Sequence, residues 1–267
     1  MAKEKKKMNY WQCQTKAFLA SFRNIAKKDF LKSALFDLLT ILSIIIIVGV
    51  CLAIVNKISA DAVPQLLQVY ELKQAGDEQA FNAAMAGYAP VLSRIMWISL
   101  ITAVLGFLLS VFFLSWFYGK AWLYKLKKKF SSLFLRKYFI LNLLWIIAWL
   151  IIIFATSYIF VTVAATIVVL VELLFFFYSD PVLRAVFDEK NNWKQNWSNF
   201  FRTARKAHWF VFFIIISIII IILLLLIAGL LTKIPALFSI VMLIFVLFLI
   251  GWMRNYVSEL VRLMKTD

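Results

Sequence analysis

The chain has 267 residues, of which 64% are hydrophobic and only 16% carry a charged side chain. Its mean hydropathy of +0.90 excludes a water-soluble globular domain, because such domains hold about 45–50% apolar and about 25% charged residues. In a soluble protein the formal charge of +16 would suggest a nucleic-acid partner. In a lipid-embedded chain the same excess indicates cytoplasmic loops and contacts with anionic headgroups, so we expect no nucleic acid.

Six apolar runs predict an all-α, polytopic integral membrane protein with six transmembrane helices. The first run lies between Lys32 and Lys57 and exceeds the length of about 20 residues that crosses the hydrocarbon layer. The apolar stretch 138–178 is long enough for two crossings, and we divide it at residues 155–157. The predicted spans are 34–55, 95–118, 138–155, 158–178, 210–231 and 236–253.

The segment 56–90 breaks the apolar pattern and predicts an outer helical loop between the first two spans. Two short helices are expected, over 64–74 and 77–85, and proline suits the first turn of the former. Asp77 can cap the second helix, and Gly76 and Gly87 suit the ends of the first and the second helix. We expect this helical hairpin to lie on the membrane surface.

The positions of Lys and Arg predict which side of the membrane each loop faces. With six spans both termini share one side, and 25 of the 29 Lys and Arg residues fall on that side. Because cationic residues collect in cytoplasmic loops, both termini are predicted to be cytoplasmic in a plasma membrane. The chain then divides into a basic N-terminal arm, 1–33, a transmembrane domain, 34–254, and a cytoplasmic tail, 255–267.

A segment rich in aromatic and cationic residues precedes spans 1, 3 and 5. In the first of these, Phe18, Phe22 and Ile25 share one helical face, so we predict basic amphipathic helices that lie in the membrane interface. The three segments also read as a repeat, although such residues serve as simple topology signals beside any span. Anionic lipid is the expected counter-ion. The predicted headgroup-binding residues are Lys16, Arg23, Lys27, Lys28, Lys127, Lys128, Lys129, Arg136, Lys137, Arg202, Arg205 and Lys206.

Ionisable residues at membrane depth are candidates for function. Asp37 lies in the first turn of span one, where headgroup water or Lys32 can reach it. Glu172 lies about 9 Å inside the cytoplasmic end of span four. It is either a structural carboxyl held by Asn142, a threonine or a cation, or a proton or cation site. The predicted intramembrane polar residues are Glu172, Asp37, Thr162, Thr166 and Asn142.

The sequence lacks the residue sets that most enzymes need, so we expect neither catalysis nor a cofactor. The only histidine is His208, which leaves multi-histidine metal sites and histidine-based triads incomplete. Asp180, Asp188 and Glu189 could hold a divalent cation, but solvated charge is common at such a position. We therefore expect no metal.

The first functional interpretation is a non-enzymatic scaffold or accessory subunit that contacts anionic lipids through its basic segments. The alternative is a small transporter or channel subunit with a polar path near Glu172 and Asp37. All four prolines lie in predicted loops or at span boundaries, whereas carriers often interrupt their helices at mid-membrane. A lipid-acting enzyme is a third interpretation. The apolar faces allow contacts with other membrane proteins or with a second copy of this chain.

Overall fold

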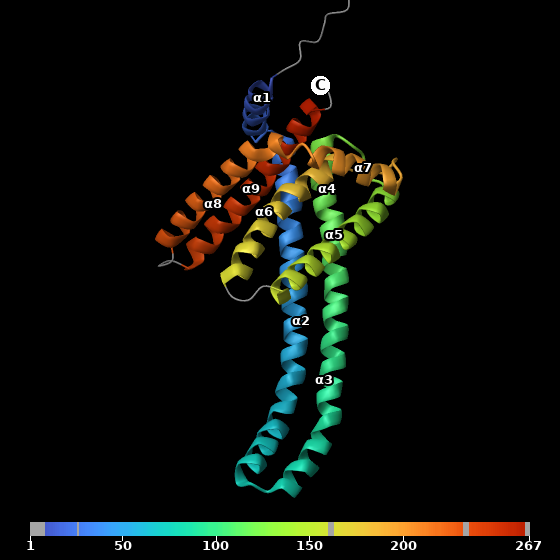
Figure 1. The fold of residues 1–267 in the computed structure, drawn as a ribbon, viewed down its shortest axis with the longest axis vertical. Coiled ribbons are helices and arrows are strands. Elements are labelled where there is room, and N and C mark those ends of the chain that lie inside the picture. The colour runs from blue at the N-terminus through green and yellow to red at the C-terminus, as the bar shows by residue number, and fades with distance from the viewer. Residues whose placement is uncertain (1–8, 26, 160–162, 232–234, 265–267) are drawn as a thin grey trace, which may run out of the picture. The chain divides into compact units, whose positions relative to one another are not determined.

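The computed structural model describes residues 9–25, 27–159, 163–231 and 235–264, and every element in these ranges is helical (Figure 1). The predicted all-α class is therefore confirmed. In chain order the elements are α1 (Tyr10–Arg23), α2 (Lys28–Ala75), α3 (Glu78–Phe113), the π-helical turn η1 (Leu114–Tyr118), α4 (Gly119–Leu126), α5 (Ser132–Ile159), α6 (Val163–Val186), α7 (Trp193–Ala204), the 3-10 turn η2 (Ala207–Phe210), α8 (Val211–Leu231) and α9 (Pro235–Met264).

Among the described residues, four helical stretches are long and apolar enough to cross a membrane. A bent pair of helices, in which Trp193–Ala204 meets His208–Leu223 at 68°, makes a fifth if the pair counts as one span. Helices of this kind suit a membrane-embedded protein. The four stretches are Lys28–Ala60, Glu78–Leu126, Ser132–Ile159 and Leu237–Met264.

The chain divides into two compact units. Unit 2 is Thr40–Leu114, and unit 1 combines the residues up to Leu39 with those from Ser115 onward. In unit 2 the predicted separate helices over 64–74 and 77–85 are wrong, because α2 and α3 continue through these residues. A proline inside a helix removes one backbone donor and clashes with the carbonyl four residues before it, at a cost of about 3 kcal/mol, which the other residues of α2 offset. Pro90 and Pro181, which were expected in a loop or at a span boundary, also lie inside helices.

The turn between α2 and α3 confirms the predicted stop at Gly76 and the cap at Asp77, whereas the predicted stop at Gly87 is wrong, because Gly87 lies inside α3. Gly76 has a φ of +73°, a left-handed conformation that glycine adopts without steric cost. The side chain of Asp77 accepts a hydrogen bond from the Ala80 backbone N–H at 3.0 Å and so caps α3. Near this turn, Ala62, Val69 and Tyr88 form a small buried cluster.

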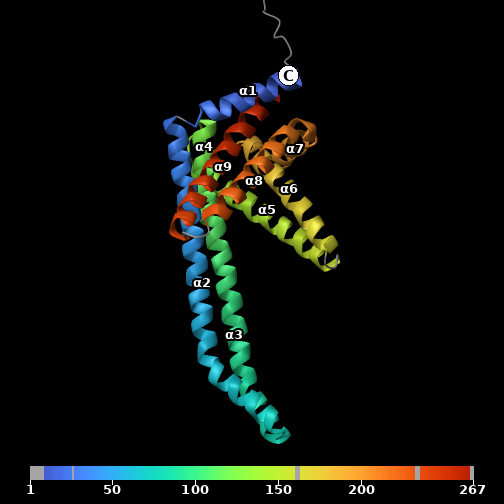
Figure 2. The ribbon, with the colours of Figure 1, turned by 90° about the vertical axis from the view of Figure 1, so that its left-hand side faces the viewer.

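In unit 1, α9 contacts α1, α4, α6 and α8 and forms the centre of the core. Figure 2 shows α1 crossing the end of α9. Within the predicted cytoplasmic tail, 255–267, α9 continues to Met264, and Tyr256, Val257 and Leu260 are fully buried. These apolar side chains recur at helical spacing, so they extend the buried face of α9.

Separate helices, α1 and α7, form in two of the three places where basic amphipathic helices were predicted, and their position in a membrane interface stays a prediction. Each begins with a capping box, in which an asparagine and the glutamine three residues later bond to each other's backbone N–H. The separate helix predicted before span 3 is wrong. The Ser131 hydroxyl accepts a hydrogen bond from the Phe134 N–H at 3.0 Å, and α5 starts there and runs directly into the apolar stretch.

One other predicted detail is corrected in unit 1. The turn placed at 155–157 is helical, since α5 ends at Ile159 and α6 begins at Val163.

The face of α1 that packs in unit 1 consists of small and polar residues, namely Cys13, Gln14, Ala17 and Ser21. Small side chains let α1 approach α9 closely. Phe22, which was predicted to face the membrane interface, is 41% exposed.

Candidate functional site

A buried arginine organises the polar interior of unit 1. Arg184 of α6 is 5% exposed and binds Asp180 through two parallel hydrogen bonds of 2.8 and 2.7 Å. Its remaining nitrogen, Nη1, donates to the Tyr138 hydroxyl at 2.7 Å and to Asn142 Oδ1 at 2.6 Å. Asn142 in turn donates to Ser115 at 2.8 Å. A charged side chain can remain buried when it forms a bidentate ion pair and its remaining donors also have hydrogen-bond acceptors.

A second buried pair joins two residues of unit 1 that lie 217 positions apart in sequence. Arg254 Nη2 lies 2.5 Å from both carboxylate oxygens of Asp37, and both side chains are 1% exposed. The prediction that headgroup water or Lys32 reaches Asp37 is therefore wrong. The Nε and Nη1 atoms of Arg254 have no hydrogen-bond partner among the described residues. The guanidinium instead faces the ring of Trp122 at 5.8 Å.

Tyr118 connects the two arginines. Its ring centre is 4.7 Å from the Arg184 guanidinium carbon and 5.4 Å from that of Arg254. Tyr118 and Ser115 both belong to the π-helical turn η1, and such turns often occur at functional sites. The extra residue in this turn changes the angular spacing of the side chains that follow it. One turn thus supplies contacts to both buried charge pairs.

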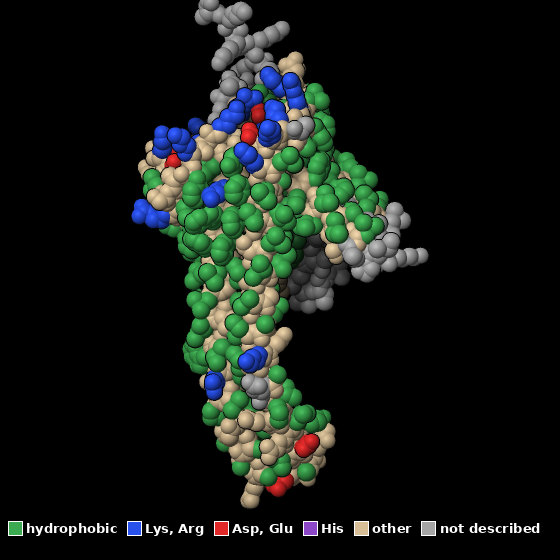
Figure 3. All heavy atoms as spheres, turned by 180° about the vertical axis from the view of Figure 1, so that it is seen from behind, with side chains coloured by type: hydrophobic (Ala, Val, Ile, Leu, Met, Phe, Trp, Pro, Cys, Tyr) green, Lys and Arg blue, Asp and Glu red, His purple; other side chains and the backbone are tan. Residues whose placement is uncertain are grey.

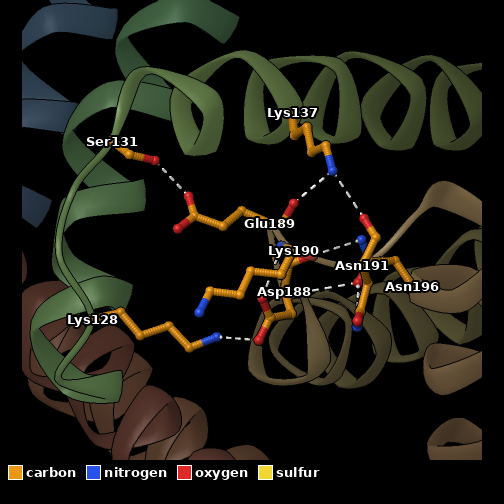
Figure 4. A network of polar contacts seen from close by, with 8 residues as sticks. All are labelled: Lys128, Ser131, Lys137, Asp188, Glu189, Lys190, Asn191 and Asn196. Atoms are coloured by element: carbon orange, nitrogen blue, oxygen red, sulfur yellow. Dashed lines mark hydrogen bonds and ion pairs between the residues drawn. The ribbon is translucent and has the colours of Figure 1, made fainter.

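The connector after α4 and the connector after α6 are held together by polar contacts (Figure 4). Lys128 forms an ion pair of 2.7 Å with Asp188, and Ser131 donates to Glu189 at 2.6 Å. Lys137 donates to the Glu189 backbone carbonyl at 2.6 Å. Partial burial alone would raise the pKa of Asp188, but the hydrogen bonds from Lys128 and from the Lys190 N–H hold it below its ordinary value.

Beside these connectors lies a hollow of about 600 Å³, which we call the basic hollow. Its charged lining residues come from α4, α9 and the two connectors: Lys125, Lys127, Lys128, Asp188, Glu259 and Arg262. A hollow of about 200 Å³ shares Lys125, Lys127 and Glu259 with it and adds Lys27. A third hollow, of about 340 Å³, adds Arg202 and Lys206. Together these hollows gather cations from four of the predicted cytoplasmic segments.

The predicted headgroup-binding residues lie at the surface of unit 1. All of them are exposed except Lys137, which is half-buried against the connector after α6. On the face drawn in Figure 3, Lys and Arg gather at the end of unit 1 that carries α1, beside a largely hydrophobic helical surface. No finding tests whether they bind lipid, so that role remains a prediction.

Among the intramembrane polar residues that the structure describes, Asp37, Asn142 and Glu172 each have different partners. Glu172 is half-buried and accepts a hydrogen bond from the Thr156 hydroxyl at 3.1 Å. This contact agrees with the interpretation of Glu172 as a structural carboxyl that is held by a threonine. Asn142 bonds to Arg184 and Ser115 instead. Thr162 lies outside the described residues. Thr166 belongs to α6, and the placement of its side chain is also outside the description.

Sequence reasoning missed both buried arginines. Both were counted only among the 25 cations on the predicted cytoplasmic side, and no buried partner was expected for either. Two signals were available: the four-residue spacing of Asp180 and Arg184 on one helix, and an acid at the start of one apolar run with an arginine at the end of another. The second signal does not identify which arginine pairs with Asp37, because that depends on which helices pack together.

The acids considered for a divalent cation each have another partner: Arg184 for Asp180, Lys128 for Asp188 and Ser131 for Glu189. Among the described residues no group of three His, Cys, Asp or Glu side chains could hold a metal ion. Comparison with known proteins found no match to a protein family, to a curated protein or to a solved structure.

Proposed function

We propose that this chain is a non-enzymatic scaffold or accessory subunit of the cytoplasmic membrane, which holds anionic lipid at the basic end of unit 1. In this proposal the chain crosses the membrane six times, with both termini and the connectors after α4 and α6 on the cytoplasmic side. The observation that carries the proposal is the gathering of exposed cations from α1, both connectors and α7 at that end.

The outward face of α1 supports a membrane contact. Trp11, Leu19 and Phe22 are 66%, 62% and 41% exposed, although the opposite side of the helix is packed on α9. Lys16 and Arg23 are exposed on the same helix. Exposed aromatic side chains mixed with cations are typical of helices that lie in a headgroup layer, where each cation contributes about 1 kcal/mol of attraction to an anionic leaflet.

The interior of unit 1 favours a scaffold over a transporter. The alternative function needs a polar path near Glu172 and Asp37, and Asp37 is 1% exposed and paired with Arg254. A charge that is sealed and neutralised in this way is expected of a structural element. We therefore assign Asp37 and Arg254 to the stability of the helix packing.

Hydrogen exchange of the full chain in phosphatidylcholine vesicles, with and without phosphatidylglycerol, tests this proposal. We expect slower exchange in residues 16–25 and 127–131 when the anionic lipid is present. The turn at Gly76 and Asp77 is the internal control and should not change. Exchange that is equal in the two vesicle types throughout 16–25 and 127–131 would remove the lipid-contact function.

A charge variant makes the test specific. Replacement of both Lys16 and Arg23 by glutamine should reduce the lipid-dependent protection of α1 and leave that of the connector after α4 in place. The comparable double replacement of Lys57 and Lys73, which lie in α2, should leave both effects unchanged.

A further inference from the structure

We propose that the basic hollow binds a phosphate monoester group that is carried on a larger molecule. This inference deepens the proposed lipid-contact function and rests on it, because it assigns part of that contact to a defined cavity. The hollow is lined by four cationic residues and two carboxylates, so its lining has an excess of two positive charges. A phosphate monoester carries close to two negative charges at neutral pH, whereas the phosphodiester of an ordinary headgroup carries one.

The size and walls of the hollow suit a group larger than phosphate alone. A volume of about 600 Å³ is within the range of small-molecule sites. Leu126, Val186, Phe187 and Val261 provide apolar lining beside the charged residues. The guanidinium of Arg262 can donate two hydrogen bonds to phosphate oxygens, and the lysines can bind the same group as point charges.

Glu259 acts as the internal counter-ion of this site. Its carboxylate lies 3.4 Å from Lys125 and 2.6 Å from Arg262, and it is 16% exposed. The two cations are thus drawn together by an acid of the protein's own α9. An incoming phosphate would compete with Glu259 for the same donors, so loss of this carboxylate should tighten phosphate binding.

Lys127 is the second residue that can test this site, because its side chain lines the hollow although its backbone conformation is unfavourable for lysine. It ends α4 with φ 54° and ψ 36°, a left-handed conformation that glycine adopts more easily. Its exposed side chain lines both the basic hollow and the neighbouring hollow of about 200 Å³. A glycine here would relax the backbone and remove the charge. The substitution should therefore weaken phosphate binding without lowering the stability of the fold.

The test uses the full chain in a neutral detergent at fixed ionic strength, titrated with glycerol phosphate and followed by intrinsic tryptophan fluorescence. We expect saturable binding, about tenfold weaker binding in Lys127→Gly and tighter binding in Glu259→Gln. The melting temperature of Lys127→Gly should equal or exceed that of the wild type. Lys129→Gly is the matched control, since Lys129 is exposed in the same connector and is not among the lining residues of the hollow.

The second arm distinguishes the source of the phosphate. Vesicles that contain phosphatidic acid, a monoester lipid, are compared with vesicles that contain phosphatidylglycerol, a diester. A preference for phosphatidic acid that is lost in Lys127→Gly identifies a lipid ligand. Saturable binding of glycerol phosphate without that preference identifies a soluble phosphate ester.

Two results would overturn the inference: no saturable binding in the wild type, or equal weakening in Lys127→Gly and Lys129→Gly. The latter would mean a diffuse charge effect. If either result is found while phosphatidylglycerol still slows hydrogen exchange in residues 16–25 and 127–131, only the phosphate site is excluded and the lipid-contact function stands. If phosphatidylglycerol does not slow that exchange either, the phosphate site and the lipid-contact function are both excluded.

Discussion

The buried charges of unit 1 and the cations of the basic hollow are the same residue types in two different situations. Arg184 and Arg254 are 5% and 1% exposed, and each has its carboxylate partner within the fold. Arg262 is 68% exposed and shares Glu259 with Lys125. Burial, and not residue type, therefore separates the charges that hold the helices together from the charges that are available to a ligand.

The largest effect should come from the pair that joins α2 to α9. Asp37→Leu or Arg254→Met alone leaves an uncompensated charge in the interior, which should lower the free energy of unfolding by about 3–5 kcal/mol. The double variant should recover most of that loss, because two apolar side chains replace the whole pair. Denaturant unfolding in detergent, followed by tryptophan fluorescence, gives the unfolding free energies of the wild type, the two single variants and the double variant, which together form a double-mutant cycle. Additive losses in the double variant would show that the two residues do not act as a pair.

A smaller effect is expected when the charge at position 184 is kept and only its shape is changed. Arg184→Lys cannot satisfy Asp180, Tyr138 and Asn142 together, so we expect a loss of about 1–3 kcal/mol of unfolding free energy. Arg136→Lys, at an exposed position of α5, should change stability by less than about 0.5 kcal/mol. The same unfolding assay compares the two, and equal effects would contradict the assignment of Arg184 to the structural group.

The smallest effect belongs to the surface pair of the connectors. The pKa of Asp188 is held below its ordinary value of 3.8, so its stabilisation is present above that value and is lost as the pH falls through the lowered folded-state pKa. Asp188→Asn should lower stability at neutral pH by at most about 1 kcal/mol, because the pair is partly solvated. Melting temperatures of the two proteins should converge in acid. A difference that is as large in acid as at neutral pH would contradict this sign.

The sequence predicted those features of the fold that depend on local chemistry. The helical class, the cap at Asp77 and the glycine stop at Gly76 follow from composition and from neighbouring residues. The continuation of α2 through Pro64 was not predicted, because a proline reads as a boundary when the packing around it is unknown. Helix length is set by all of the residues in the helix and not by one breaker.

The site was predicted less well, because its partners lie far apart in the chain. Asp37 and Arg254 are separated by 217 positions, so no spacing in the sequence relates them. The cations themselves were identified, but their division into paired and available groups depends on which acids the fold brings near, such as Glu259 beside Lys125. Sequence therefore located the basic end, and the fold defined the hollow in it.

Side-specific cysteine labelling tests whether the basic end of unit 1 faces the cytoplasm, as we propose. In a background in which Cys13 and Cys51 are replaced by alanine, single cysteines are placed at Lys127 and at Asp77 and exposed to a membrane-impermeant thiol reagent in intact cells. We predict that the cysteine at 77 reacts at once and that the cysteine at 127 reacts only after the membrane is opened. Reaction at 127 in intact cells would contradict the account.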